Sequence, residues 1–173
     1  MKCTELLDKD HQIILRALVV LEQMADEVNK GHSVDPRDVE SIICFLKQFE
    51  DEHHQTKEES ALFPELLRTS AANNGPLRQM IFEHDQERSL VEGIEDALYT
   101  RKGIEFVEYA DRLTSLLRTH IRKEDTILFD IAERCLSAEQ DNKVTAELDQ
   151  FHIDMGFLAD LRRLEWTYLR RVA

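Results

Sequence analysis

A histidine followed four residues later by a glutamate occurs twice in this chain, first as His54-x3-Glu58 and again as His120-x3-Glu124. On an α-helix such a pair lies on one face about one turn apart, so the imidazole and the carboxylate can chelate one metal ion. One copy is weak support, because short motifs of this kind also arise by chance. The flanking residues also match, however: Lys57 and Lys123, Glu59 and Asp125, Ser60 and Thr126, Leu62 and Leu128, and Phe63 and Phe129.

Two further histidines lie on apolar helix faces that precede the two copies. His11 shares a face with Leu7, Ile14, Leu18, Leu21, Ala25 and Val28, and His84 shares one with Leu77, Ile81, Val91 and Leu98. A lone histidine in such a place is usually a core residue satisfied by a hydrogen bond. Here Asp10-His11 and Glu83-His84 align with each other, which indicates an internal duplication. Each half would supply one helix with an inward histidine and one with an inward His-x3-Glu pair.

Burial of Glu58 and Glu124 would require a compensating positive charge. An unpaired buried carboxylate costs on the order of several kcal/mol or is forced into its neutral form. A pair of metal ions shared by both glutamates would supply that charge. Because the candidate ligands are imidazoles and carboxylates, with no thiolate, we expect iron first and then manganese or zinc.

The pattern predicts an all-α protein of one domain over residues 1–173, with an antiparallel up-down four-helix bundle at about 4–135. Only five Gly and three Pro are present, too few for a turn-rich β architecture. The first expected helix runs from Thr4 to Lys30. The second runs from Pro36 to about Glu59; Pro64 kinks or ends it, and a short continuation reaches Arg68. After a loop at 70–75 a third helix restarts at Pro76, and a fourth follows Gly103. An additional C-terminal helix is expected at about 137–171, because Ser137 and Gln140 form a capping-box pattern.

Charge and composition exclude several classes of function. A net charge of −13 argues against nucleic acid and anionic membranes as partners. No apolar run approaches the roughly 18 residues of a membrane span, and acids interrupt the N-terminal segment where a signal peptide would be apolar. We therefore expect a cytoplasmic protein. The three cysteines are far apart and odd in number, which favours free thiols over disulfides.

The remaining histidines and a cluster of arginines receive other interpretations. His53 has Lys57 rather than a glutamate at the fourth position onward, so it is expected beside the site and not in it. His32 falls in a loop, and His152 lies at the edge of an apolar stripe, where a structural role is expected. The four arginines near the C-terminus suit a solvated helix face; they are Arg162, Arg163, Arg170 and Arg171.

The motifs together resemble the hemerythrin-like family of His/His/Glu cation-binding bundles. The resembling pieces are Asp10-His11, His54-x3-Glu58-Glu59-x2-Leu62-Phe63-Pro64, Glu83-His84 and His120-x3-Glu124-x3-Leu128-Phe129. They cover residues of about 4 to 135, and the C-terminal helix lies outside them. The resemblance implies a non-haem pair of iron ions with a bridging oxo or hydroxo group, held by His11, His54, Glu58, His84, His120 and Glu124.

The chain departs from the oxygen-carrying members of that family at one position. Those carriers have a fifth histidine one turn after the one that corresponds to His84, and here that residue is Arg88. Asp125 stands at the spacing from His120 that the carriers use, so Glu124 and Asp125 are both candidates, with the internal repeat favouring Glu124. Counting ligands for two six-coordinate ions leaves one open position on each. We therefore expect binding of, or reaction with, O2, nitric oxide or peroxide, rather than reversible oxygen carriage.

Several functional alternatives remain open at this stage. Within the di-iron interpretation, the sequence does not separate sensing, stress defence and iron handling. It also does not decide among an enzyme, a carrier and a sensor, although the missing fifth histidine makes a carrier the least expected. A bundle that binds zinc or manganese structurally is a second interpretation, and a metal-free interaction module is a third. The C-terminal helix could cover the bundle or pair two subunits into a homodimer.

Overall fold

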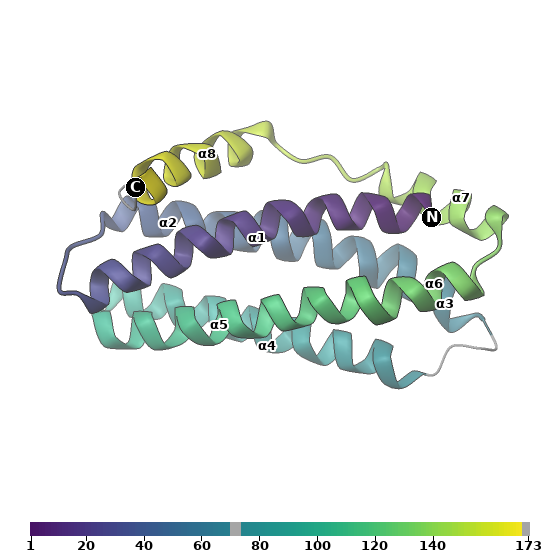
Figure 1. The fold of residues 1–173 in the computed structure, drawn as a ribbon, viewed down its shortest axis with the longest axis horizontal. Helices are drawn as coiled ribbons and strands as arrows, with labels where there is room; N and C mark the ends of the chain where they lie inside the picture. Colours follow the sequence, from purple (N-terminus) through teal and green to yellow (C-terminus); the bar gives the residue numbers. More distant parts are fainter. Residues whose placement is uncertain (70–73, 171–173) are drawn as a thin grey trace.

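Long helical rods lie side by side along the molecule in the computed structural model, which describes residues 1–69 and 74–170 (Figure 1). The first rod is α1, Lys2–Asn29, and the third is α4, Asn74–Tyr99. The second rod comprises α2 (Pro36–Phe45), η1 (Leu46–Gln55), η2 (Glu58–Leu62) and α3 (Phe63–Leu67). The fourth rod comprises α5 (Gly103–Lys123), η3 (Glu124–Leu128) and α6 (Phe129–Cys135). The described residues contain no β-strand. The prediction of an all-helical bundle is therefore confirmed.

Local sequence signals set the starts of several helices as expected. The Asp35 side chain accepts a hydrogen bond from the backbone N–H of Arg37, and Pro36 occupies the first turn of α2, where its missing N–H costs nothing. Pro64 likewise lies in the first turn of α3, and the helical course continues to Leu67. The third rod begins at Asn74, two residues before the expected start at Pro76. The rest of the expected loop, residues 70–73, lies outside the described residues.

Both segments that carry the His-x3-Glu pairs contain π-helical turns, which the sequence analysis did not predict. These are η1 and η2 in the second rod and η3 in the fourth. A π turn contains more residues than an α turn, so the buried face shifts around the rod. Within η1, the neighbouring residues His53 and His54 are both buried, in agreement with such a shift.

The expectation of a single C-terminal helix over about 137–171 is wrong. Two helices occur there, α7 (Ala138–Leu148) and α8 (Met155–Leu169), and residues 149–154 between them are not helical. The Asp154 side chain accepts a hydrogen bond from the backbone N–H of Gly156, which starts a new helix instead of continuing the first. The apolar stripe was misleading, because Met155 is 62% exposed. The capping box of Ser137 and Gln140 at the start of α7 is present as expected.

The two C-terminal helices attach to opposite ends of α1 (Figure 1). Asp141 of α7 accepts hydrogen bonds from the backbone N–H groups of Lys2 and Cys3. Arg163 of α8 forms an ion pair of 2.6 Å with Asp38 of α2, and the Tyr168 hydroxyl donates to the same carboxylate. Arg163 therefore fixes α8 to the bundle. Arg171, from the same predicted arginine cluster, lies outside the described residues.

The apolar core consists of two clusters with a polar layer between them. On α1, Leu7 belongs to the smaller cluster and Ile14 to the larger one, with His11 between them. On the fourth rod, Ile121 and Leu128 flank Glu124 in the same way. The rods thus bring the predicted metal-binding residues to one level of the bundle.

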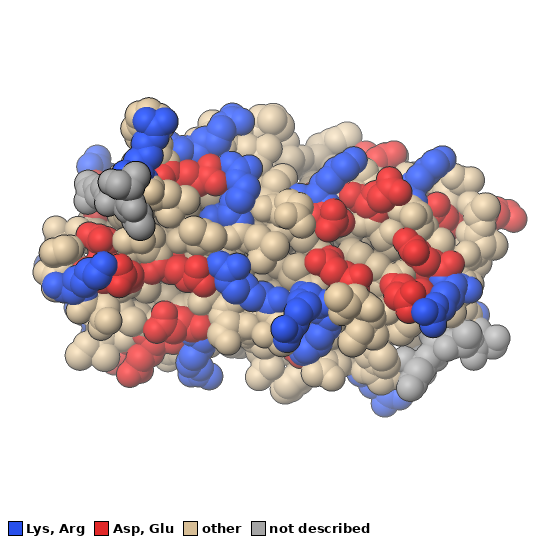
Figure 2. Space-filling model, viewed as in Figure 1, with Lys and Arg blue, Asp and Glu red and all other residues tan. Residues whose placement is uncertain are grey.

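Charged side chains, helix polarity and free thiols complete the description of the chain. Acidic and basic side chains are interspersed on the face shown in Figure 2. No helix in the described part of the chain is long and apolar enough to cross a membrane. Cys3, Cys44 and Cys135 are all free thiols.

We predict that acid weakens the attachment of α7 through Glu65. Hydrogen bonds from Lys143 and Gln140 of α7 lower the pKa of Glu65 to about 2. Because this pKa lies below that of an unfolded glutamate, about 4.3, the stabilisation is complete above that pH and is lost as pH falls towards 2. Glu65→Gln should therefore lower the free energy of unfolding at pH 7 more than at pH 3, measured by urea denaturation. The exposed Glu147→Gln serves as control, and an equal loss at both pH values would contradict the prediction.

Candidate metal centre

Six predicted residues converge in the polar layer, from all four rods. His11 comes from α1, His84 from α4 and His120 from α5. His54 lies in η1, and Glu58 and Glu124 are the first residues of η2 and η3. They form two overlapping groups, His11-His54-Glu58-Glu124 and Glu58-His84-His120-Glu124, within each of which the candidate ligand atoms lie within 4.8 Å of one another. The two glutamates belong to both groups.

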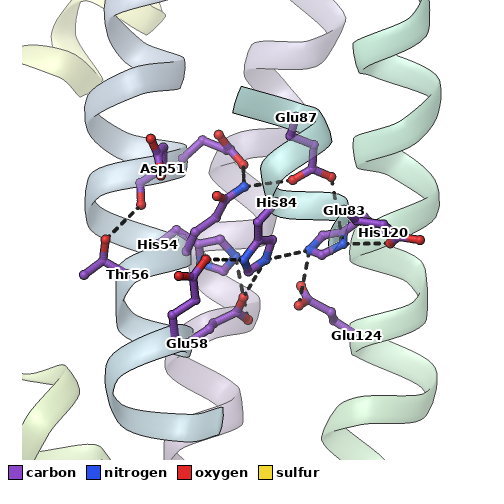
Figure 3. A network of polar contacts seen from close by, with 12 residues as sticks. Asp51, His54, Thr56, Glu58, Glu83, His84, Glu87, His120 and Glu124 are labelled. Atoms are coloured by element: carbon purple, nitrogen blue, oxygen red, sulfur yellow. Dashed lines mark hydrogen bonds and ion pairs between the residues drawn. The ribbon is translucent and has the colours of Figure 1, made fainter. Parts of the chain in front are cut away.

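Each glutamate directs its two oxygens towards different histidines. Figure 3 shows Glu58 beside His54 and His84, and Glu124 beside His120. Glu124 Oε2 lies 3.1 Å from His11 Nε2, and its Oε1 lies 3.2 Å from His120 Nε2. Glu58 Oε1 lies 3.9 Å from His54 Nε2, and its Oε2 lies 3.5 Å from His84 Nε2. Each carboxylate therefore spans the two groups, as a ligand that bridges two ions must.

The polar atoms of this cluster are buried without the hydrogen bonds that burial normally demands. All six side chains are at most 2% exposed. Both ring nitrogens of His54, both oxygens of Glu58 and Oε1 of Glu124 have no hydrogen-bond partner. Each such atom costs about 1–3 kcal/mol, and more when the group is charged. Cations bound between these imidazoles and carboxylates would satisfy these atoms, and the donor set suits iron, manganese or zinc. The residues therefore fit a two-ion centre.

Protonation of the histidines indicates how strongly the cluster attracts positive charge. Burial lowers the pKa of His11, but hydrogen bonds to Asp125 and Glu124 outweigh it and raise that pKa to about 10. Burial likewise opposes the effect of Glu58 and Glu59 on His84, whose pKa also rises to about 10. The carboxylates thus stabilise protonated imidazoles where no other cation is bound, so metal binding at neutral pH would release protons from these histidines.

A second carboxylate contacts the outward nitrogen of each inner histidine. At His11, His84 and His120 this contact is a hydrogen bond, which fixes the tautomer because Nδ1 carries the hydrogen and Nε2 is left free to bind inward. The Nδ1–oxygen pairs are His11–Asp125 at 2.7 Å, His54–Asp10 at 3.6 Å, His84–Glu59 at 2.7 Å and His120–Glu83 at 3.0 Å. This arrangement gives Asp125 an outer position and Glu124 an inner one.

Cations hold three of these four outer carboxylates. Lys57 donates to Asp10 at 2.7 Å, Arg88 donates to Glu59 at 2.8 Å, and Lys123 donates to Glu83. Among the described residues, Asp125 has no ion pair with a lysine or arginine. The recurrence of Lys57 and Lys123 beside the two glutamates was the available signal for this layer, but the sequence alone assigned them no role.

The other histidines lie outside the inner cluster. His53 Nε2 lies 2.6 Å from Lys57 Nζ, and burial together with Lys57 lowers the pKa of His53 to about 4, so this ring accepts a hydrogen bond from the lysine. The expectation that His53 lies beside the site agrees with this position. His32 is exposed and pairs with Glu27, and His152 is exposed.

We predict that substitutions at Glu124 and Asp125 have different effects. Glu124→Gln should lower the number of ions bound per chain, because a shared ligand is weakened. Asp125→Asn should keep that number but weaken affinity about 10- to 100-fold, as loss of an outer hydrogen bond to a ligating histidine does. Both are measured by zinc titration with competing chelators, with the exposed Asp130→Asn as control. The reverse pattern would assign the inner role to Asp125.

Comparison with known proteins agrees with this geometry. The family model described as the hemerythrin HHE cation-binding domain matches residues 3–132. No curated protein and no solved structure matches the chain. The matched region contains all six inner residues and ends before α7 and α8. The chain therefore belongs to the hemerythrin HHE cation-binding domain family.

Proposed function

We propose that this protein holds two iron ions and binds or reacts with a small molecule such as O2, nitric oxide or peroxide. The observation that carries this proposal is the pair of overlapping His/Glu groups that share Glu58 and Glu124. His11 and His54 would hold one ion, and His84 and His120 the other. The two glutamates and an oxo or hydroxo group would bridge them. When bound, such an iron pair supplies redox chemistry towards small oxygen and nitrogen species.

The chain itself orients the inner side chains and excludes water from them. Phe129 stacks on His11 with ring centroids 5.5 Å apart, and Phe63 stacks on His84 at 5.9 Å. These two phenylalanines occupy equivalent places in the repeat. The outer carboxylates hold the far side of each imidazole. The rings of His11 and His84 are thus held from two directions, which keeps them in the geometry that ligation requires.

Arg88 supports reactive or sensing chemistry over reversible oxygen carriage. It occupies the place of the fifth histidine of oxygen carriers, and its guanidinium is bound to Glu59 and Asp51 at 2.8 Å each. Guanidinium remains protonated and is not a metal ligand. An open position would therefore remain on each ion. We place the function within sensing, stress defence or iron handling.

A structural zinc or manganese site is the second candidate, because the donor set accepts these ions too. The unpaired buried atoms of Glu58 and His54 argue against a metal-free interaction module.

We also propose that residues 1–173 form one domain, that the rods form an antiparallel up-down bundle of duplicated hairpins, and that the protein acts in the cytoplasm. The colour order along the rods in Figure 1 supports the alternating direction. The exposed Trp166 and Met155 of α8 support a homodimer through the C-terminal helices.

Metal analysis distinguishes these functions. The purified protein should contain two irons per chain with near-ultraviolet oxo-to-iron absorption; zinc alone would favour the structural alternative. His54→Ala should lose about one ion and lower the melting temperature, since it removes a ligand and leaves Glu58 buried. His32→Ala, at an exposed loop histidine, should change neither. Unchanged metal content and melting in His54→Ala would contradict the assignment.

Anaerobic titration with O2 and with nitric oxide, followed optically, tests the reactive function. The reduced iron protein should form a nitric oxide adduct and should be oxidised by O2 without a long-lived adduct. A stable oxygen adduct that dissociates fully on removal of O2 would instead identify a carrier.

A further inference from the structure

A second group of buried acids lies beside the metal centre, between η1 and α4. It consists of Glu50, Gln55 and Glu87, which are 2%, 1% and 0% exposed. The Gln55 side-chain amide donates to Glu87 Oε2 at 2.8 Å and also to Glu50. Glu87 Oε1 lies 3.8 Å from His120 Nδ1, so the group reaches the centre (Figure 3). No role in the centre described above requires these three residues.

The other half of the duplication has apolar residues at the same places. With His54 aligned on His120, Glu50 corresponds to Leu116 and Gln55 to Ile121; with His11 aligned on His84, Glu87 corresponds to Ile14. Ile14 and Ile121 belong to the larger apolar cluster, and Leu116 packs against it. The inner ligands are therefore duplicated, whereas this polar group occurs on one side only. A structural requirement shared by both halves does not explain it.

A surface pocket leads to this group from solvent. It has a volume of about 190 Å³, and the buried Glu50 lines it together with Asp51, Glu52, Glu92 and Arg88. Glu52 and Glu92 are exposed. Arg88 is bound to Asp51 and Glu59, and Lys47, which also lines the pocket, is bound to Glu95. Acidic side chains are thus in excess at the pocket, and an acidic concave surface concentrates cations and repels anions.

The buried group has unused oxygens, and among the described residues neither of its carboxylates forms an ion pair with a lysine or arginine. Oε1 of Gln55 and Oε1 of Glu87 have no hydrogen-bond partner. Burial and the neighbouring Glu87 raise the pKa of Glu50 well above its usual value. Half a turn of the Gln55 amide would present a carbonyl oxygen to the space between the carboxylates. Two carboxylates and an amide oxygen are ligands that divalent cations accept.

We propose that Glu50, Gln55 and Glu87 form a transit site through which a divalent cation passes from the surface pocket to the His/Glu centre. This inference rests on the proposed function, because it supplies the two-ion centre with its metal. Glu50 receives the cation at the inner end of the pocket, and Glu87 passes it to the side of the centre formed by His84 and His120. The apolar residues at the equivalent places close the opposite side.

Loading kinetics test this route separately from the centre itself. Metal-free protein is mixed with Co2+ in a stopped-flow instrument, and the rise of the cobalt absorption gives the loading rate. Glu50→Gln preserves shape but removes a carboxylate that can release its proton to bind the cation, and should slow loading about 10-fold. The final number of two ions and their affinity should not change. Glu108→Gln removes a carboxylate from an exposed site on α5 and should load at the wild-type rate.

Two further measurements keep the test decisive. Glu50→Leu copies the residue of the other half and should slow loading at least as much as Glu50→Gln. Added salt should slow loading of the wild type, because it screens the attraction of the exposed acids that line the pocket, Glu52 and Glu92. Wild-type loading rates in both Glu50 variants would overturn the transit site, and so would a lower ion number or affinity with an unchanged rate. Wild-type protein that binds no cobalt would instead overturn the two-ion centre.

Discussion

Burial of two carboxylates at the middle of a helical bundle is the constraint on which this structure depends. Glu58 and Glu124 are both fully buried, and neither can be ionised there without compensating positive charge. Four imidazoles face them, and those imidazoles are in turn oriented by four outer carboxylates. From the centre outward, carboxylates, imidazoles and a second set of carboxylates follow one another, so acidic and basic groups alternate in the polar layer between the two apolar clusters. A bound pair of cations would balance the charge of the inner carboxylates.

The duplication is strict near the centre and loosens with distance from it. The inner histidines and glutamates, the stacked phenylalanines and the outer carboxylates recur in both halves. The cations beside the outer carboxylates recur only in part, since Lys57 has a counterpart in Lys123 whereas Arg88 corresponds to Leu15. The group around Glu50 has no polar counterpart. The residues that would hold the ions are thus shared by both halves, whereas the residues of the proposed transit site occur in one half only.

The sequence predicted the inner cluster because repetition singled out its residues without any knowledge of the fold. The outer contacts could not be predicted in the same way. Asp125 meets His11 across two rods, and no spacing along the chain indicates such a pair. The π-helical turns were not predicted either, because the sequence analysis assumed a regular α-helical period through 36–59 and after Gly103. The C-terminal region was misjudged because its helical period continues through 149–154, whereas the Asp154 cap decides the local structure. Local hydrogen bonds there outweigh periodicity.

Division of the core into two apolar clusters bears on how the molecule loses its structure. The smaller cluster unites the N-terminus, α3, α6 and α7, and the larger one unites the opposite end with α8. The polar layer with the proposed metal centre lies between these ends. Proteins open in contiguous units that amide hydrogen exchange detects. We therefore expect ligation of the centre to couple the two ends, so that they unfold as one unit with the ions bound and more independently without them.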